Sequence, residues 1–184
     1  RPIAFVSTKS KDGILNLAPF SYFNGVCSNP PTVMFAPARR GYDGLTKDTL
    51  NNIRDTEEFT VNIVSEQMAE PMVACATDFE KDVDEFEVSG LTPINSVKVL
   101  PPRVKESKVS FECKLNIIVP VGEPGPGGGF VVIGTIVMFH IDDEVYKDGR
   151  IDLNILNPVG RLAGNYYTRV HDTFKIVRQI KPDN

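Results

Sequence analysis

Residues 16–31 read NLAPFSYFNGVCSNPP, and this stretch decides how the fold is interpreted. It follows a hairpin signal and precedes the apolar run TVMFA, so it should contain an ordinary strand. Pro19, however, has no N–H to donate to a neighbouring strand, so the strand must bulge or lie at a sheet edge there. Either arrangement leaves backbone N–H and C=O groups around Pro19 free for a ligand.

The side chains of this stretch mix small groups with aromatic rings. The small ones are Ala18, Ser21, Gly25 and Ser28, and the aromatic ones are Phe20, Tyr22 and Phe23. Small residues allow another group to approach the backbone closely, and the rings offer flat apolar walls. Together they suit a planar heteroaromatic ligand with polar edges, although a loop that caps the core could have the same composition.

Period-2 alternation of apolar and polar residues dominates the rest of the chain and predicts a mainly β fold. The expected strands span residues 3–8, 14–18, 32–36, 58–64, 109–117, 130–141 and 165–170. Helices are expected at residues 46–55, 65–76 and 82–88, which are too few for repeated βαβ units. We therefore expect residues 1–184 to form one domain, an antiparallel barrel with helical insertions.

Residues 109–117, VSFECKLNI, show the clearest alternation. The odd-numbered residues are expected to face the core, and the even-numbered ones, which include Ser110 and Glu112, are expected to face water. Cys113 is then a small buried hydrophobic residue rather than a catalyst. Gly134, inside the next expected strand, indicates a bulge or a close approach by another group.

The overall composition excludes several classes of protein. The net charge of −4 argues against a nucleic-acid-binding protein, which usually carries a basic excess. Three cysteines without a CxxC spacing, together with two histidines, predict neither a disulfide framework nor a metal site, and favour a reducing, cytoplasmic setting. No apolar run approaches the roughly 20 residues of a membrane span. Because the chain starts at Arg1 within a strand pattern, we expect residues to be missing upstream.

The segment LTKDTLNNI, residues 45–53, has the features of a helix start. Thr46 is a suitable N-cap, and Asp48 suits the first turn. Lys47 does not, because a cation at a helix N-terminus opposes the helix dipole. An anion such as a phosphate would remove this conflict, with Arg39 and Arg40 nearby to add charge. The alternative is a solvated lysine on a capped surface helix.

Two further residues are candidates for chemistry. Arg161, within PVGRLAGNYY at residues 158–167, could pair with a ligand charge or stack on a ring, or it could simply hold a turn. His140 ends the expected strand 130–141, where it is either a satisfied core residue or a catalyst. The sequence contains no P-loop, GxGxxG or catalytic triad. An enzyme without such catalytic motifs would depend on a cofactor for its chemistry.

Several stretches, taken in order, resemble the flavin reductase-like family, also called flavoredoxin-type FMN-binding split-barrel proteins. They are RPIAFVST, NLAPFSYFN, KDTLNNI, EFTVNIV, DEFEVSGLTP, PPRVKES, FECKL, DGRID and PVGRLAGNYYTRV. The resemblance implies a mainly β, six-stranded Greek-key split barrel that forms a homodimer and binds FMN. The FMN-binding residues that it implies are Asn16, Ala18, Pro19, Ser21, Tyr22, Phe23, Ser28, Lys47, Asp48, Thr49, Arg161 and Tyr166.

The resemblance also implies an activity. The first hypothesis is an oxidoreductase that receives a hydride from NADH or NADPH and passes electrons to free flavin, a monooxygenase or another redox partner, with His140 near the nicotinamide or the ring. The second is an FMN electron carrier without NAD(P)H turnover of its own. The third is a non-catalytic barrel that binds a ligand. The sequence decides neither the nucleotide nor the electron acceptor.

Overall fold

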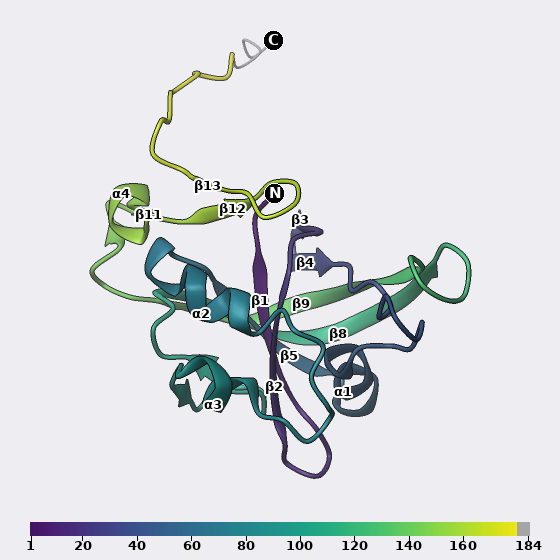
Figure 1. Cartoon of the computed structure of the whole chain (residues 1–184). Coiled ribbons are helices and arrows are strands. Elements are labelled where there is room, and N and C mark those ends of the chain that lie inside the picture. Colours follow the sequence, from purple (N-terminus) through teal and green to yellow (C-terminus); the bar gives the residue numbers. More distant parts are fainter. Residues whose placement is uncertain (180–184) are drawn as a thin grey trace.

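Seven strands form one antiparallel sheet in the order β2-β1-β5-β8-β9-β4-β3 in the computed structural model, which describes residues 1–179 (Figure 1). These strands are β1 (Ala4–Lys9), β2 (Leu15–Phe20), β3 (Phe23–Ser28), β4 (Pro31–Phe35), β5 (Glu58–Ile63), β8 (Val109–Val121) and β9 (Gly129–Ile141). The mainly β, antiparallel class is confirmed. The sheet has one strand more than the six that were expected, because Phe23–Ser28 pairs with β4 as a strand of its own.

Smaller elements surround this sheet. The helical ones are α1 (Asp48–Thr56), η1 (Glu66–Met68), α2 (Ala69–Ala74), α3 (Glu85–Ser89) and α4 (Leu153–Leu156). Three short ribbons pair β6 (Pro93–Ile94) with β7 (Arg103–Val104), β10 (Tyr146–Lys147) with β11 (Arg150–Ile151), and β12 (Val159–Arg161) with β13 (Tyr167–Arg169). Among residues 1–179, no helix is long and apolar enough to cross a membrane. Residues 180–184 of the expected domain lie outside the described part.

The two edge strands of the large sheet, β2 and β3, both come from residues 15–28. Pro19 lies in β2 opposite Phe5, and the pairing of β2 with β1 continues through it to Phe20 without a shift in register. Of the two expected arrangements, the sheet edge is therefore the correct one. The register shift lies instead in β3, between Gly25 and Cys27.

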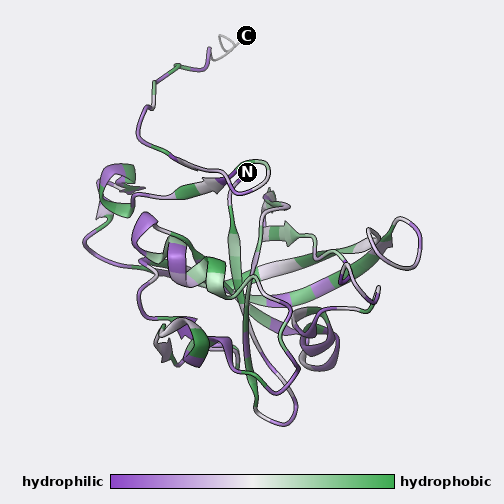
Figure 2. Cartoon of the chain, in the orientation of Figure 1, coloured by the Kyte–Doolittle hydropathy of each residue, from purple (hydrophilic) through white to green (hydrophobic). Residues whose placement is uncertain are grey.

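The strand β1 is buried on both faces and separates two apolar clusters. Val6 belongs to a cluster that includes Leu50 and Ile53 of α1. Phe5, on the opposite face, belongs to a second cluster that includes residues of α2 and α3, namely Met72 and Phe86. Figure 2 shows the hydrophobic residues along β1 and the β8–β9 hairpin. The helices are thus held on either side of β2, where a cavity forms.

Gly134 permits close packing in the first cluster, as the sequence predicted. A Cβ atom at this position would lie 2.5 Å from the Phe59 ring, which is too close for any side chain. The Phe59 ring in turn packs edge-on against Phe35 at a centroid distance of 5.5 Å. Cys113 is fully buried in the same cluster, again as expected.

The expected exposure of the even-numbered residues in β8 is wrong for Ser110 and Glu112, which are both buried. The segment between β6 and β7 covers this face, and the N–H groups of Val97, Lys98 and Val99 donate to the Glu112 carboxylate. Ile117, expected in the core, is 51% exposed, because the register shift between Leu115 and Ile117 changes the alternation, and Ile118 packs against the first cluster instead. A local alternation pattern cannot reveal either effect.

The helix boundaries also differ from the expectation. Thr46 is not the N-cap of α1, since its hydroxyl donates to Asn51 instead. The helix begins at Asp48, with Lys47 as the N-cap residue and without a side-chain cap hydrogen bond. The helix expected at residues 65–76 is divided into η1 and α2.

Candidate functional site

A cavity lies between β2, the start of α1, the loop after α2, and α3. It brings together half of the residues that the resemblance implied for FMN, namely Asn16, Ala18, Pro19, Lys47, Asp48 and Thr49. An adjoining hollow shares Pro19 and Ala76 with this cavity and adds Ser21 and Arg161. We call the two hollows together the β2 cavity. Its walls come from segments that are far apart in the sequence.

Four of the implied residues lie outside the β2 cavity. The Tyr22 ring is 62% exposed, with the Arg1 guanidinium 5.6 Å from its centroid. Phe23 packs partly against the core, and Ser28 is exposed at the end of β3. Tyr166 is 75% exposed. Their role in binding stays a prediction.

The cavity also contains residues outside the FMN-binding set that the resemblance implied, although Phe20 was expected as an apolar wall. They are Phe20, Arg40, Glu85 and the loop residues Cys75, Ala76, Thr77, Asp78 and Phe79. Arg40 was noted only as nearby charge. Glu85 lies in a run of acidic residues, DVDEFE, that has the composition of a helix surface, so no local signal distinguishes it from its exposed neighbours.

The start of α1 offers donors to the cavity. The N–H groups of Leu50 and Asn51 both donate to the Lys47 carbonyl, which leaves those of Asp48 and Thr49 without an intrahelical acceptor. Free N–H groups at a helix start, together with the helix dipole, favour an anion. Lys47 stands at this position, and its ammonium pairs with Asp78 from the loop after α2.

Arg40 adds a second cation that is only partly satisfied. One terminal nitrogen contacts the Asp48 carboxylate at 2.5 Å. The Nε atom of Arg40 is buried and has no hydrogen-bond partner within residues 1–179. A buried donor without an acceptor costs about 1–3 kcal/mol.

A buried polar chain forms the floor of the cavity. The Asn16 amide nitrogen donates to the Glu85 carboxylate at 2.8 Å, and the N–H of Leu17 donates to its other oxygen at 3.0 Å. The Asn16 carbonyl accepts the hydroxyl of Thr49 at 2.7 Å and that of Thr8 at 3.2 Å. Burial raises the pKa of Glu85 to about 7, although these donors act in the opposite direction.

The chain matches the model of the family described as "Flavin reductase like domain" over residues 1–167. It belongs to the flavin reductase-like family. The match covers every wall of the β2 cavity.

Solved structures of related proteins agree with this assignment. Nitrilotriacetate monooxygenase component B from Bacillus cereus is 37% identical, with a TM-score of 0.90 over 96% of this chain and 87% of that one. The 2-nitrobenzoate 2-nitroreductase of Pseudomonas fluorescens is 33% identical, with a TM-score of 0.82 over 97% and 85%. A flavin reductase-type protein with a split barrel domain from Shewanella frigidimarina is 27% identical, with a TM-score of 0.85 over 97% and 86%. The flavin reductase-like chain thus has the split-barrel fold that its sequence implied.

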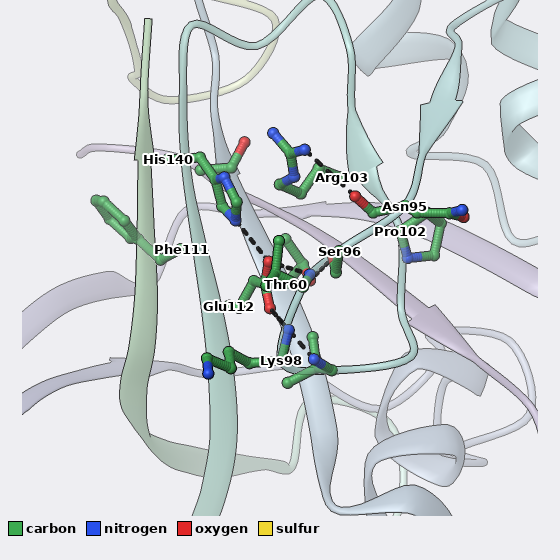
Figure 3. A network of polar contacts seen from close by, with 12 residues as sticks. Thr60, Asn95, Ser96, Lys98, Pro102, Arg103, Phe111, Glu112 and His140 are labelled. Carbon is green, nitrogen blue, oxygen red and sulfur yellow. Dashed lines mark hydrogen bonds and ion pairs between the residues drawn. The ribbon is translucent and has the colours of Figure 1, made fainter.

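His140 of this flavin reductase-like chain is not among the residues that line the β2 cavity. Its Nε2 atom contacts the Glu112 carboxylate at 2.5 Å, and Figure 3 shows this pair beside the segment that carries Ser96 and Lys98. Burial alone would raise the pKa of Glu112, but the N–H groups of Val97 and Lys98, followed by His140, hold it below its usual range. The geometry within one chain gives His140 a structural partner, and its catalytic role stays a prediction.

Proposed function

We propose that the chain binds FMN in the β2 cavity and acts as a flavin-dependent oxidoreductase. The observation that carries this proposal is the start of α1, where two N–H groups without an intrahelical acceptor and the Lys47 ammonium meet in one cavity of a flavin reductase-like fold, which Arg40 also lines. These are the donors that a phosphate requires. The edge strand around Pro19 and the neighbouring Ser21 would then hold the ring.

The ion pairs already present in the cavity affect how a phosphate would bind there. Asp78 and Asp48 already pair with Lys47 and Arg40. A phosphate at the start of α1 would therefore compete with Asp78 for the Lys47 ammonium. Because Asp78 belongs to the loop after α2, we expect this loop to shift when FMN binds.

Bound FMN would supply the redox chemistry, accepting and releasing electrons. The residues of the chain bind and orient it: Lys47 and Thr49 at the phosphate, and the β2 edge at the ring. We propose NADH or NADPH as the reductant and free flavin or a redox partner as the acceptor. The related nitroreductase and monooxygenase component are consistent with such a role. The alternatives are an FMN electron carrier without NAD(P)H turnover and a ligand-binding barrel without catalysis.

Anaerobic reduction tests this function. The protein loaded with FMN is expected to lose its flavin absorbance rapidly when NADH or NADPH is added without oxygen. The control is the same amount of free FMN with the same nucleotide. Flavin that binds but is bleached by neither nucleotide would leave only the electron carrier, and a chain that binds no flavin would leave only the ligand-binding barrel.

We also propose a homodimer. The hairpin of β8 and β9 exposes several large apolar side chains, namely Ile117, Val119, Val121, Val137, Phe139 and Ile141. Exposed apolar groups of this number favour an interface, and a second copy of the chain is the commonest partner. Sedimentation equilibrium that shows a monomer at micromolar concentration would contradict this proposal.

A further inference from the structure

Glu85 is a buried carboxyl group at the β2 cavity that the proposed function does not yet use. Its side chain belongs to α3, and the residue is only 6% exposed. Both carboxylate oxygens receive hydrogen bonds from β2, one from the Asn16 amide and one from the Leu17 N–H. A buried group held in this way acts on the site through its partners rather than through solvent.

The other charged groups nearby do not neutralise Glu85. The two cations of the cavity are committed to other carboxylates, Lys47 to Asp78 and Arg40 to Asp48. Both of those carboxylates line the same cavity and add negative charge to it.

Two groups next to Glu85, Asp84 and Cys75, also provide no positive charge that could pair with it. Asp84, the N-cap of α3, accepts the N–H of Phe86 and repels the Glu85 charge. Cys75, at the end of α2, is a thiol whose pKa is raised to about 11 by burial, so it stays neutral. Among the described residues Glu85 therefore has hydrogen-bond donors but no cation as a partner.

The ionised form of Glu85 fixes the direction of every hydrogen bond in the chain beyond it. A carboxylate can only accept, so Asn16 must turn its amide nitrogen to Glu85 and its carbonyl oxygen to Thr49. The hydroxyl proton of Thr49 is then used by Asn16, and Thr49 can only accept from a ligand. This polarity is unfavourable for a phosphate, which needs donors.

We propose that Glu85 is a positioning residue that couples the binding of a phosphate group at the start of α1 to the uptake of one proton. With a proton on the oxygen that faces Asn16, Glu85 donates to the Asn16 carbonyl, and the amide turns over. The amide nitrogen then donates to the hydroxyl oxygens of Thr49 and Thr8. Thr49 is released to donate its proton into the cavity. The proton comes from solvent, and no covalent bond changes.

The proton balance sets the direction of the pH dependence. A new negative charge in a cavity that already holds Asp48 and Asp78 favours protonated Glu85, so binding takes up a proton. The raised pKa of Glu85, about 7, places this event within the physiological range. The inference rests on the proposed function, because it assumes that the phosphate of FMN is the anion.

Affinities for FMN and riboflavin at pH 6 and pH 8 test the inference, measured for the wild type, Glu85→Gln and Glu87→Gln. Glutamine can accept from Leu17 and donate to Asn16, so Glu85→Gln copies the protonated form. If only the protonated form of Glu85 binds FMN well, the ratio of the wild-type FMN affinity to the Glu85→Gln affinity falls about tenfold from pH 6 to pH 8, given a pKa of about 7. Riboflavin, which lacks the phosphate, should show no such fall. The matched control Glu87→Gln, an exposed residue of the same helix, should behave as the wild type.

A second measurement on the ligand-free protein separates this inference from the proposed function. The side-chain amide resonance of Asn16 is expected to titrate near neutral pH in the wild type and not in Glu85→Gln. Thr49→Val should keep this titration but lose the pH dependence of FMN affinity. The inference is overturned if the amide does not titrate, or if Glu85→Gln keeps the wild-type pH dependence for FMN. If FMN binds at neither pH, the proposed function is wrong. The affinities of the wild type and Glu85→Gln for inorganic phosphate at pH 6 and pH 8 then decide the role of Glu85.

Discussion

Replacing Lys47 with alanine is expected to weaken FMN binding about 10- to 100-fold and to leave riboflavin binding almost unchanged. The expected loss follows from one charge-assisted hydrogen bond, worth about 1.5–3 kcal/mol, at about 1.4 kcal/mol for each factor of ten. The substitution also leaves Asp78 without its cation, so its charge would further oppose the phosphate. Fluorescence titration of both flavins measures the difference.

Two other variants sharpen this test. Asp78→Asn is expected to strengthen FMN binding, because it removes the carboxylate that competes for Lys47. Lys11→Ala, which removes an exposed lysine paired with Asp55 of α1, is the matched control and should change neither flavin. Equal losses for FMN and riboflavin in Lys47→Ala would show that the phosphate lies elsewhere.

Replacing Glu112 with alanine is expected to lower the free energy of unfolding by about 3 kcal/mol. The change removes a fully buried acceptor from three backbone N–H groups in the segment 97–99 and from His140. Urea unfolding measures the loss. Lys114→Ala, an exposed change two residues further along β8, should stay within about 0.5 kcal/mol of the wild type.

The pH dependence of the same network has a definite sign. Because the folded-state pKa of Glu112 is lowered, its contribution to stability is present above its ordinary value and is lost as the pH falls through the folded-state value. Glu112→Gln should lose less stability than Glu112→Ala and should lack this acid-linked component. If Glu112→Ala unfolds at the wild-type urea concentration, the segment 97–99 does not depend on this carboxylate.

Local patterns in the sequence predicted much of the fold. Alternation located the long strands, and the missing N–H of Pro19 indicated a bulge or a sheet edge, of which the structure has the edge. Gly134 indicated a bulge or a close approach, and the structure shows a close approach to Phe59. These features depend on the chemistry of a single residue or on its immediate neighbours, so the sequence carries them directly.

Contacts between distant segments could not be predicted in the same way. Glu112 has the pattern of an exposed residue, but a segment 13 to 15 positions earlier covers it. Likewise Lys47 was expected to meet an anion, and the fold supplies one of its own from Asp78, 31 positions away. Glu85 and Asn16 are 69 positions apart, and only the packing of α3 on β2 brings them together.

Binding of FMN to the purified chain tests the central claim most directly. Titration of the ligand-free protein with FMN, followed by quenching of flavin fluorescence, is expected to saturate at one FMN for each chain. The expected dissociation constant lies well below about 100 μM, and the affinity for riboflavin is expected to be lower. An unchanged FMN signal at that concentration, or binding that Lys47→Ala leaves intact, would contradict a flavin site in the β2 cavity.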